Sequence, residues 1–392
     1  MLDWLIVGGG IHGVHLGSRL VRRGVPTEGI RIVDPAPRLL HQWHRCVEAT
    51  GMTYLRSPVV HHLDGDPYAL KRFAETWTGA TRPLFRPPYD RPSVELFAAH
   101  AAHVIERDGL ADVHVQDRVE GVELSCDAAE VRLASGTTVR AERVVLAIGA
   151  SEQPHHPAWA RDLVDAPVHH VFGADGTGAL DAPPDSVAIV GGGITAAQVA
   201  LRLADGQRNV YLLMRHAPRA HVFDSDPGWI GPKHMRAFLA TPDHDARRRT
   251  IQRARHRGSI PPRQLRRLKG AIDRGDVTAV QATVQRATPT EQGLHLDLGD
   301  AALPEVTVDA VFLATGFEAR RPGGAWVDAL RDGHELPCAA CGYPIVDRAL
   351  RWHPRVFVTG PLAELELGPV SRNIVGARRA SERMMAIAGG YR

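Results

Sequence analysis

The sequence predicts an α/β fold in which one parallel-sheet domain is inserted into another. Two glycine-rich turns carry this prediction, Gly8-Gly9-Gly10-Ile11-His12-Gly13 and Gly191-Gly192-Gly193-Ile194-Thr195-Ala196. Each turn follows a short apolar run and precedes a stretch with helical apolar spacing, which is the order of a βαβ unit. A third observation is the apolar run Val356 to Thr359, which precedes a glycine and is expected to return to the first sheet. The strands and helices expected around the two turns are Leu2 to Val7, Val14 to Arg23, Ile30 to Val33, Val187 to Val190, Ala196 to Leu203 and Val210 to Met214.

The first turn has the glycines that a bound nucleotide pyrophosphate requires. Gly8 permits the tight turn, Gly10 lets a pyrophosphate approach the backbone at the helix N-terminus, and Gly13 lets the helix and the strand pack closely. The next expected strand ends at Asp34, about 20 residues beyond the last glycine, where a Rossmann-like fold places the acid that binds a ribose. We therefore expect the first turn to hold the adenosine half of FAD.

The second turn repeats this pattern but ends differently. Its expected cofactor contacts are Gly191, Gly193, Thr195 and Ala196. The strand that follows stops at Arg215, where an acid would otherwise stand, and Arg219 lies a few residues further on. A carboxylate at this place would repel a 2′-phosphate, whereas a guanidinium binds it with two hydrogen bonds. The second turn is therefore expected to hold NADPH.

Short alternating runs between the two turns predict an antiparallel meander inserted into the first domain. They are Val113 to Gln116, Val119 to Leu124, Glu130 to Leu133 and Thr138 to Arg140. Val144 to Ile148 is apolar throughout and ends at Gly149, so it is expected to return to the parallel sheet. Ala310 to Ala314 is the corresponding strand of the second domain, and Gly316 follows it. Both glycines are expected to lie near the cofactors.

The C-terminal segment is expected to complete the first domain. Its strand ends before Gly360, which is expected to lie against the flavin, and Gly368 is expected to begin the last helix, whose N-terminus would stabilise negative charge on the flavin ring. The prediction is thus two nested Rossmann-like domains. Residues 1–170 and 316–392 form the FAD-binding domain, and residues 171–315 form the NADPH-binding domain.

The composition is that of an ordinary globular protein and limits the classes of partner. The chain has 392 residues, of which 44% are hydrophobic and 23% charged, and its formal net charge is +3. That charge is too small to indicate a nucleic-acid-binding protein. The first expected strand begins at residue 2, which leaves no room for a signal peptide, and no apolar run approaches the roughly 20 residues of a membrane span. We therefore expect a cytosolic protein that binds neither nucleic acid nor a membrane.

Four cysteines in a chain of this length imply no disulfide framework. Cys338 and Cys341 have the spacing of a redox-active or zinc-binding pair. A four-sulfur zinc site needs a second close pair, however, and Cys46 and Cys126 are far apart. No metal is expected, and the pair is either structural or a redox-active disulfide.

The two nested domains, together with the strand end Ala314-Thr315-Gly316-Phe317, resemble the two-dinucleotide flavoproteins over essentially the whole chain. Within them the chain is most similar to the NADPH-dependent flavin monooxygenases, especially those that hydroxylate the side-chain amines of ornithine and lysine. Trp43-His44 followed by Gly51-Met52 is similar to the segment that those N-hydroxylases place beside the flavin ring, although the two dipeptides are further apart here. Arg215 fits the NADPH preference of that family.

This resemblance implies a single-component monooxygenase in which NADPH reduces the flavin. The reduced flavin would then react with molecular oxygen and hydroxylate a small amine, or a similar nucleophile, through a flavin hydroperoxide. Because the cofactor carries the difficult chemistry, no catalytic dyad or triad is expected. The candidates near the ring lie in the loop-rich stretch after Asp34 and are Gln42, Trp43, His44, Met52, Arg56 and Ser57. Trp43 either covers the flavin or is a core aromatic, and Arg56 either faces the pyrimidine end of the ring or forms a surface ion pair.

Two other functions remain open from the sequence. One is an NADPH-dependent flavin reductase of a disulfide, a quinone or a redox protein, with Cys338 and Cys341 as a relay. The other is a flavin-containing binding module whose basic stretch, Arg247 to Lys269, recognises an acidic macromolecule. That stretch has the apolar spacing of amphipathic helices with a solvated face, and it could also help to dock NADPH or an acidic substrate. The substrate and the oligomeric state are not predicted.

Overall fold

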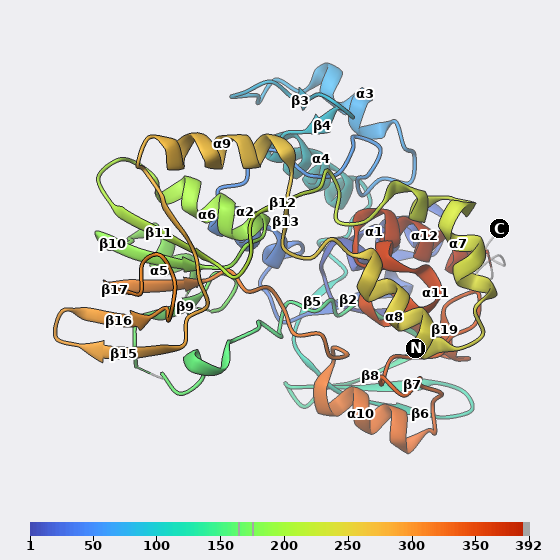
Figure 1. Cartoon of the computed structure of the whole chain (residues 1–392). Coiled ribbons are helices and arrows are strands. Elements are labelled where there is room, and N and C mark those ends of the chain that lie inside the picture. Colours follow the sequence, from blue (N-terminus) through green and yellow to red (C-terminus); the bar gives the residue numbers. More distant parts are fainter. Residues whose placement is uncertain (164, 175, 387–392) are drawn as a thin grey trace.

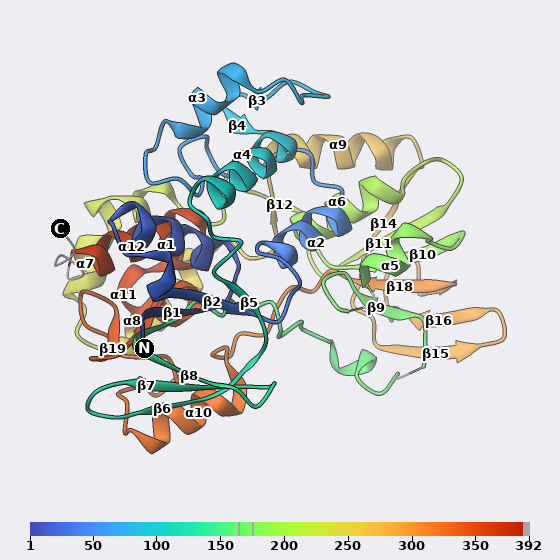
Figure 2. The ribbon, with the colours of Figure 1, turned by 180° about the vertical axis from the view of Figure 1, so that it is seen from behind.

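The computed structural model describes residues 1–163, 165–174 and 176–386, so the last residues of the predicted first domain lie outside the described residues. Figure 1, and Figure 2 from behind, show two lobes, each built around a sheet that contains parallel strands. The fold is therefore a mixed α/β fold with parallel sheets, and this part of the prediction is confirmed. None of the described helices combines the length and the apolar character that crossing a bilayer demands.

The first lobe is built on a sheet in which β19, β20, β8, β1, β2 and β5 lie side by side in that order. Their bounds are Leu2–Val7 (β1), Ile30–Asp34 (β2), His114–Gln116 (β5), Thr138–Leu146 (β8), Arg351–His353 (β19) and Val356–Val358 (β20). β1 pairs in parallel with β2 and β8, and β20 pairs in parallel with β8. Trp4 of β1 contacts Phe357 of β20, with ring centroids 5.5 Å apart. The core of this lobe thus contains residues from both the N-terminal and the C-terminal segments of the chain.

One strand, β8, replaces two that the sequence suggested separately, the runs Thr138 to Arg140 and Val144 to Ile148. The first half of β8 pairs antiparallel with β7 (Ala129–Leu133), which pairs with β6 (Val119–Leu124). The second half pairs in parallel with β1. The β6–β7 hairpin is therefore joined to the part of β8 that precedes its parallel pairing with β1. The helix α10 (Gly324–Gly333) packs on β6.

The helices of the first lobe come from three segments of the chain, residues 11–50, 69–107 and 364–385. Their bounds are Ile11–Arg22 (α1), His41–Thr50 (α2), Ala69–Thr76 (α3), Val94–Arg107 (α4), Glu364–Leu367 (α11) and Ile374–Met385 (α12). Ser93 caps α4 as its residue type predicts, because its Oγ accepts a hydrogen bond of 3.1 Å from the Leu96 N–H. α1 packs against α12. The packing places the N-terminal helix beside the C-terminal one (Figure 1).

The second lobe has a five-stranded sheet in the order β14-β11-β10-β18-β9, with every pair parallel. The bounds are Val168–His170 (β9), Ser186–Val190 (β10), Asn209–Met214 (β11), Thr278–Gln281 (β14) and Ala310–Leu313 (β18). α6 (Ile194–Leu203) and α9 (Pro262–Asp273) pack on the face that includes Val187 and Ile189. The antiparallel strands β15 (Arg286–Thr290), β16 (Gly293–Asp297) and β17 (Glu305–Val308) pack on the face that includes Ala188. Successive residues of β10 thus point to opposite faces of the sheet, and both faces are covered, as expected for a strand buried on both sides. The helix α5 (Gly176–Asp181) packs on the same face as α6 and α9.

One segment of the second lobe's chain crosses to the first lobe. The elements along it are β12 (Arg219–Ala220), the 3-10 turn η3 (Pro227–Ile230), α7 (Pro232–Ala240), α8 (His244–Ala254) and β13 (Ser259–Ile260). β12 and β13 pair with each other, and we call residues 221–258 between them the excursion. Trp229 of the excursion packs with Leu365 and Val370 of the C-terminal segment. The predicted range 171–315 therefore covers chain that packs on both lobes.

Candidate functional site

The first glycine turn has the geometry that a pyrophosphate cradle needs. Gly8 has a φ of +113°, and a Cβ there would lie 2.5 Å from the carbonyl oxygen of Ala147. A Cβ at Gly13 would overlap the carbonyl oxygen of Gly8, so the start of α1 packs closely on the end of β1. A Cβ at Gly10, in contrast, would meet no described heavy atom within 4 Å. The two close contacts explain Gly8 and Gly13, and the open space at Gly10 is what an approaching phosphate requires.

Asp34 ends β2 directly beside this turn. Its Oδ2 accepts a hydrogen bond of 2.6 Å from the Gly9 N–H, and its Oδ1 accepts one of 2.9 Å from the Ala36 N–H. A carboxylate oxygen has two lone pairs, so both oxygens can still accept a bond from a ribose hydroxyl. The structure thus brings Asp34 and the glycine turn together, as the sequence suggested.

His12 is a polar residue of this turn that the sequence reasoning did not single out. Its Nδ1 is 2.8 Å from Oγ1 of Thr359, at the end of β20. Its Nε2 is buried and has no hydrogen-bond partner among the described residues. Burial lowers the pKa of His12 to about 4, so the imidazole is neutral at physiological pH. The neutral imidazole of His12, with Nε2 unpaired among the described residues, therefore lies between the first glycine turn and the end of β20.

The chemistry of these groups fits FAD. The open space at Gly10, the carboxylate of Asp34 and the unpaired nitrogen of His12 are the features that a nucleotide with a pyrophosphate and a polyol chain would occupy. Gly360 has a φ of +61°, and a Cβ there would lie 3.8 Å from the His12 ring, so its backbone belongs to the same surface. When bound, the flavin would supply the redox chemistry.

A cavity of about 540 Å³ lies next to this surface, and we call it the central cavity. It is lined by the N-terminal ends of two helices, at Ile11 of α1 and at Asn373 and Ile374 of α12. Helix N-termini favour negative charge, which is the charge of a reduced flavin. The excursion forms the opposite wall with Phe223 and Asp224. The central cavity is therefore shared by chain from both predicted domains.

Trp43 lines the central cavity and is also part of the core. It lies on α2 rather than in a loop, and its ring is 5.0 Å from Phe97 and 4.9 Å from His44. Met52 does not line the cavity. It follows Gly51, the left-handed C-cap of α2, and its N–H bonds to Val47. The structure thus brings Trp43 to the cavity but not Met52.

Arg56 lines the same cavity but is held by the excursion. Its Nε donates to the carbonyl of Val222 at 3.0 Å, and its Nη2 donates to the carbonyl of His221 at 2.9 Å and to Oγ of Ser259 at 3.2 Å. Burial lowers the pKa of its guanidinium. It forms no surface ion pair with the described residues. Arg56 therefore holds both ends of the excursion beside the first lobe, a role that sequence reasoning did not predict.

Gly368 does not begin the last helix, and this expectation is wrong. α12 begins at Ile374 with Asn373 as its N-cap, and Gly368 instead precedes the 3-10 turn η5 (Pro369–Arg372). A Cβ at Gly368 would lie 3.0 Å from the sulfur of Met235, so the glycine allows close packing of the excursion. The N-terminus that faces the cavity is therefore supplied by Asn373, five residues later in the chain.

A buried ion cluster fixes one wall of the central cavity. Glu364 is fully buried, and it pairs with Arg248 of the excursion and, at 3.0 Å, with Arg372. The hydroxyl of Tyr343 lies 3.1 Å from Arg372 and 3.2 Å from Arg248. Arg372 itself lines the cavity. The cluster thus joins the excursion to the wall that would contact the flavin.

The second glycine turn repeats the geometry of the first at Gly191 but not at Gly193, where a Cβ would lie 3.3 Å from Cα of Gly258. Gly191 has a φ of +153°, and a Cβ there would lie 2.5 Å from the carbonyl oxygen of Ala314. Gly193 is the N-cap of α6, Thr195 lies in its first turn, and Ala196 is buried. Gly149 and Gly316, after β8 and β18, have φ values of +65° and +79° and open space at Cβ among the described atoms. Both sheets thus end in glycines at the edge where nucleotides bind α/β folds.

Arg215 directly follows β11 and Arg219 lies in β12, and both are exposed. Among the described residues neither forms an ion pair, so both guanidiniums are available to an anion. Their use for the 2′-phosphate of NADPH remains a prediction.

If Arg215 binds the 2′-phosphate, Arg215→Ala should weaken NADPH far more than NADH. One charged contact corresponds to roughly 10- to 150-fold in affinity. The ratio of kcat/KM for the two coenzymes measures this selectivity. Arg286→Ala, an exposed arginine of β15, is the matched control and should leave the ratio unchanged. Equal losses for NADPH and NADH in Arg215→Ala would exclude the role.

Comparison with known proteins identifies the class and then the family. Residues 5–151 match the FAD-NAD(P)-binding proteins. Residues 107–319, more than half of the chain, match the L-lysine 6-monooxygenase/L-ornithine 5-monooxygenase family. The chain belongs to that family. The predicted resemblance and the predicted FAD and NADPH cofactors are thereby confirmed.

Individual relatives agree with this assignment. L-ornithine N(5)-monooxygenase of Pseudomonas aeruginosa is 26% identical over 220 residues, which is 52% of this chain and 47% of that protein, so the match spans about half the length of the relative. The reduced ornithine hydroxylase of the same organism superposes with a TM-score of 0.75 at 20% identity over 98% of each chain. The ornithine N-hydroxylase of Kutzneria sp. 744, solved with reduced FAD, NADP+ and L-ornithine, gives 0.76 at 18% identity over 99% of each chain. At these identities the solved structures show a shared fold.

Proposed function

We propose that the protein is a single-component monooxygenase that uses FAD and NADPH to hydroxylate the amine nitrogen of a small substrate in the central cavity. One observation carries the proposal most directly. The central cavity lies where the N-termini of α1 and α12 meet, beside the cradle that fits FAD, and the excursion also lines it. A site lined by several segments of the chain can hold a substrate beside the flavin, where oxygen chemistry on the reduced ring takes place.

The finer organisation is part of this proposal. Residues 1–170 and 316–392 form a Rossmann-like FAD domain with an antiparallel meander, and residues 171–315 form the nested NADPH domain. The parallel pairings within each sheet and the two glycine turns support it. The proposed FAD contacts are Gly8, Gly10, Gly13, Asp34, Trp43, Arg56, Gly149 and Gly360. The proposed NADPH contacts are Gly191, Gly193, Thr195, Ala196, Arg215, Arg219 and Gly316.

The walls of the central cavity fit an amino acid with a side-chain amine. Asp224 and Asp226 supply carboxylates, which attract an ammonium group. Arg372 supplies a guanidinium, which binds a carboxylate. A cavity with both signs of charge suits a zwitterion better than a purely apolar substrate. In the proposed reaction, NADPH and one proton reduce O2, one oxygen atom enters the N–H bond as N–OH, and the other leaves as water.

Coupling between coenzyme and substrate tests this function. NADPH oxidation, oxygen uptake and N-hydroxylated product should rise together with L-ornithine or L-lysine. L-norvaline, which has the ornithine skeleton without the side-chain amine, should give no such product. Coupled turnover of a disulfide or a quinone, with no product from any small amine, would instead support the reductase.

The cysteine pair separates the monooxygenase from the reductase. Burial raises the pKa of both Cys338 and Cys341, so each thiol has less thiolate than an ordinary cysteine, and neither lines the central cavity. The double variant Cys338→Ser with Cys341→Ser should therefore retain NADPH turnover within about threefold, roughly 0.7 kcal/mol of barrier. Steady-state rates at saturating NADPH measure it. A loss of about a hundredfold with flavin reduction intact would establish the pair as a relay.

A further inference from the structure

The basic stretch that the sequence showed divides into two parts with different surroundings. On α8, Arg248 pairs with Glu364 and Arg247 pairs with Glu366 at 3.3 Å, so these arginines are structural. On α9, the structure gives no carboxylate within ion-pair distance of Arg263, Arg266 or Arg267 across the described chain. These three arginines of α9 are therefore among the arginines of the basic stretch for which the described chain supplies no carboxylate.

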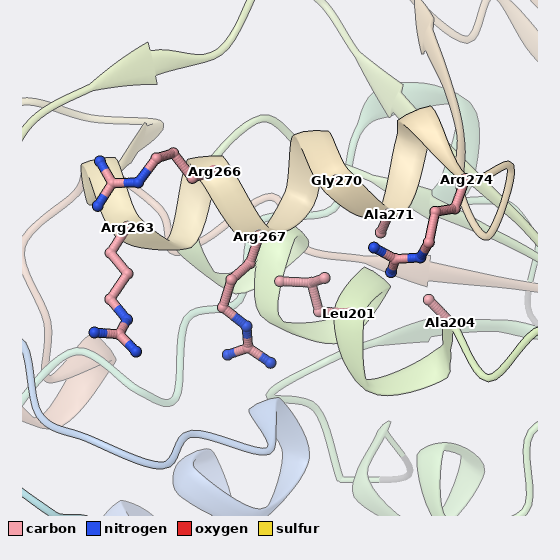
Figure 3. Close-up of a pocket in the computed structure, with 8 residues that line it drawn as sticks. All are labelled: Leu201, Ala204, Arg263, Arg266, Arg267, Gly270, Ala271 and Arg274. Atoms are coloured by element: carbon pink, nitrogen blue, oxygen red, sulfur yellow. The ribbon is translucent and has the colours of Figure 1, made fainter.

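These arginines border a groove between α6 and α9 of about 590 Å³, which we call the arginine groove. Its lining includes Leu201 of α6 with the C-cap Ala204, and Arg263 and Arg267 of α9 with the C-cap Arg274. Figure 3 shows the side chains of Arg263, Arg267 and Arg274 extending from the same side of the helix, and Arg266, which also lines the groove, near its N-terminal end. Apolar side chains thus border the groove on the α6 side, and guanidiniums border it on the α9 side.

The spacing on α9 is unfavourable for the helix alone. Arg263 and Arg267 stand at i and i+4, where like charges repel each other on a helix. Gly270 continues the same face, although glycine in a helix interior is less stable than alanine. Arg274 completes the face, and its only carboxylate partner in the described chain is Asp276, at 2.7 Å. A bound anion would relieve the repulsion.

A fourth guanidinium approaches from the first lobe. Arg86 of β3 (Phe85–Arg86) lies over the ring of Tyr54, with 3.6 Å from its central carbon to the ring centre. Burial, and then the positive charge of Arg263 and of Arg267, lower the pKa of Arg86. Positive charge from both lobes is therefore concentrated at one end of the groove.

We propose that the arginine groove binds a polyphosphate anion at a site separate from the FAD and NADPH sites. Guanidinium forks match phosphate oxygens, and the interval from Arg263 to Arg274 corresponds to roughly 16 Å of helix, which an extended anion with several charges can follow. The groove lining contains no aromatic side chain on which a base could stack, so the phosphates and not a nucleobase are recognised.

One end of the groove lies away from the coenzyme. Helices in a βαβ unit run opposite to the strands, so Ala204 and Arg274, the C-caps of α6 and α9, lie toward the sheet edge away from Gly191 and Gly193. Arg263 lies at the other end of α9, five residues after Gly258, whose Cα would lie 3.3 Å from a Cβ at Gly193, so the competition with NADP+ is the decisive arm of the test. None of Gly191, Gly193 or Arg215 lines the groove. A polyphosphate bound here should therefore leave the NADPH site accessible.

Titration calorimetry of the FAD-loaded protein with inorganic tripolyphosphate at low salt, with saturating NADP+ present, tests the proposal. Arg263→Ala with Arg267→Ala should lower the affinity by about a hundredfold or more, since each charged contact contributes roughly tenfold. Alanine is the best helix former, so this variant should fold, and its circular dichroism checks that. The matched control is Arg249→Ala with Arg253→Ala, which removes two arginines at the same spacing on α8 and should change the affinity by less than threefold.

Two further probes identify what is recognised. ADP should bind no more tightly than pyrophosphate if the base makes no contact. The proposal is overturned if tripolyphosphate does not bind at millimolar concentration, if the control variant loses as much affinity as the test variant, or if NADP+ and tripolyphosphate compete for one site. Binding of single-stranded RNA or of an acidic peptide to the groove without binding of tripolyphosphate would also overturn it.

Discussion

Gly10→Val is expected to give a folded protein that purifies without FAD. Gly10 is the N-cap of α1 with φ −79° and ψ −168°, an extended conformation that valine adopts, and no described atom lies within 4 Å of a Cβ there. The new side chain would instead fill the space that a pyrophosphate occupies. The ratio of flavin to protein absorbance measures the cofactor content, and the thermal unfolding midpoint shows whether the fold is intact.

The choice of Gly10 makes this test selective. Gly13→Val would clash with the backbone of Gly8 and would not separate folding from cofactor binding. Gly333→Val, which also meets open space among the described atoms, is the matched control and should stay yellow. A Gly10→Val protein with a full complement of FAD would refute the assignment of the first turn.

Glu364→Gln is expected to destabilise the protein by about 3–5 kcal/mol, because a buried charge pair that loses one partner leaves the other charge uncompensated. Here the variant would leave Arg248 and Arg372 without their shared carboxylate. Urea unfolding measures the change. Since Arg372 lines the central cavity, retention of FAD should also fall.

An exposed ion pair provides the control for Glu364. Glu152 pairs with Arg118 at 2.9 Å, but its side chain is 67% exposed. Glu152→Gln should therefore cost only about 0–1 kcal/mol. Similar small losses in the two variants would mean that the buried cluster does not hold the excursion on the first lobe.

The parts of the fold that the sequence predicted are those in which local pattern decides the structure. The strand β1 and the strand–turn–helix units around both glycine turns agree with the sequence pattern. The helix α2 was missed because its residues are mostly polar and the prolines further along suggested loops. The continuity of β8 was missed because it changes partners midway, which no local pattern reveals.

The candidate site depended more on contacts distant in sequence. Trp43 was singled out from a short motif and Arg56 from the stretch after Asp34. Both line the central cavity, but the bonds from Arg56 to the excursion could not be predicted. His12 lies inside the first turn, so its position was known, but its bond to Thr359 joins opposite ends of the chain. Likewise, α12 begins after Asn373 and not at Gly368, because the residues that follow Gly368 form the 3-10 turn η5 before the helix starts.

The fate of labelled oxygen tests the central proposal most directly. The purified protein, loaded with FAD, is supplied with NADPH, the best small amine and 18O2, and the product is analysed by mass spectrometry. We expect one 18O atom in each N-hydroxylated amine and one NADPH oxidised per product in the fully coupled reaction. A hydroxylated amine whose oxygen comes from water, or NADPH oxidation that labels no amine at all, would contradict a flavin monooxygenase.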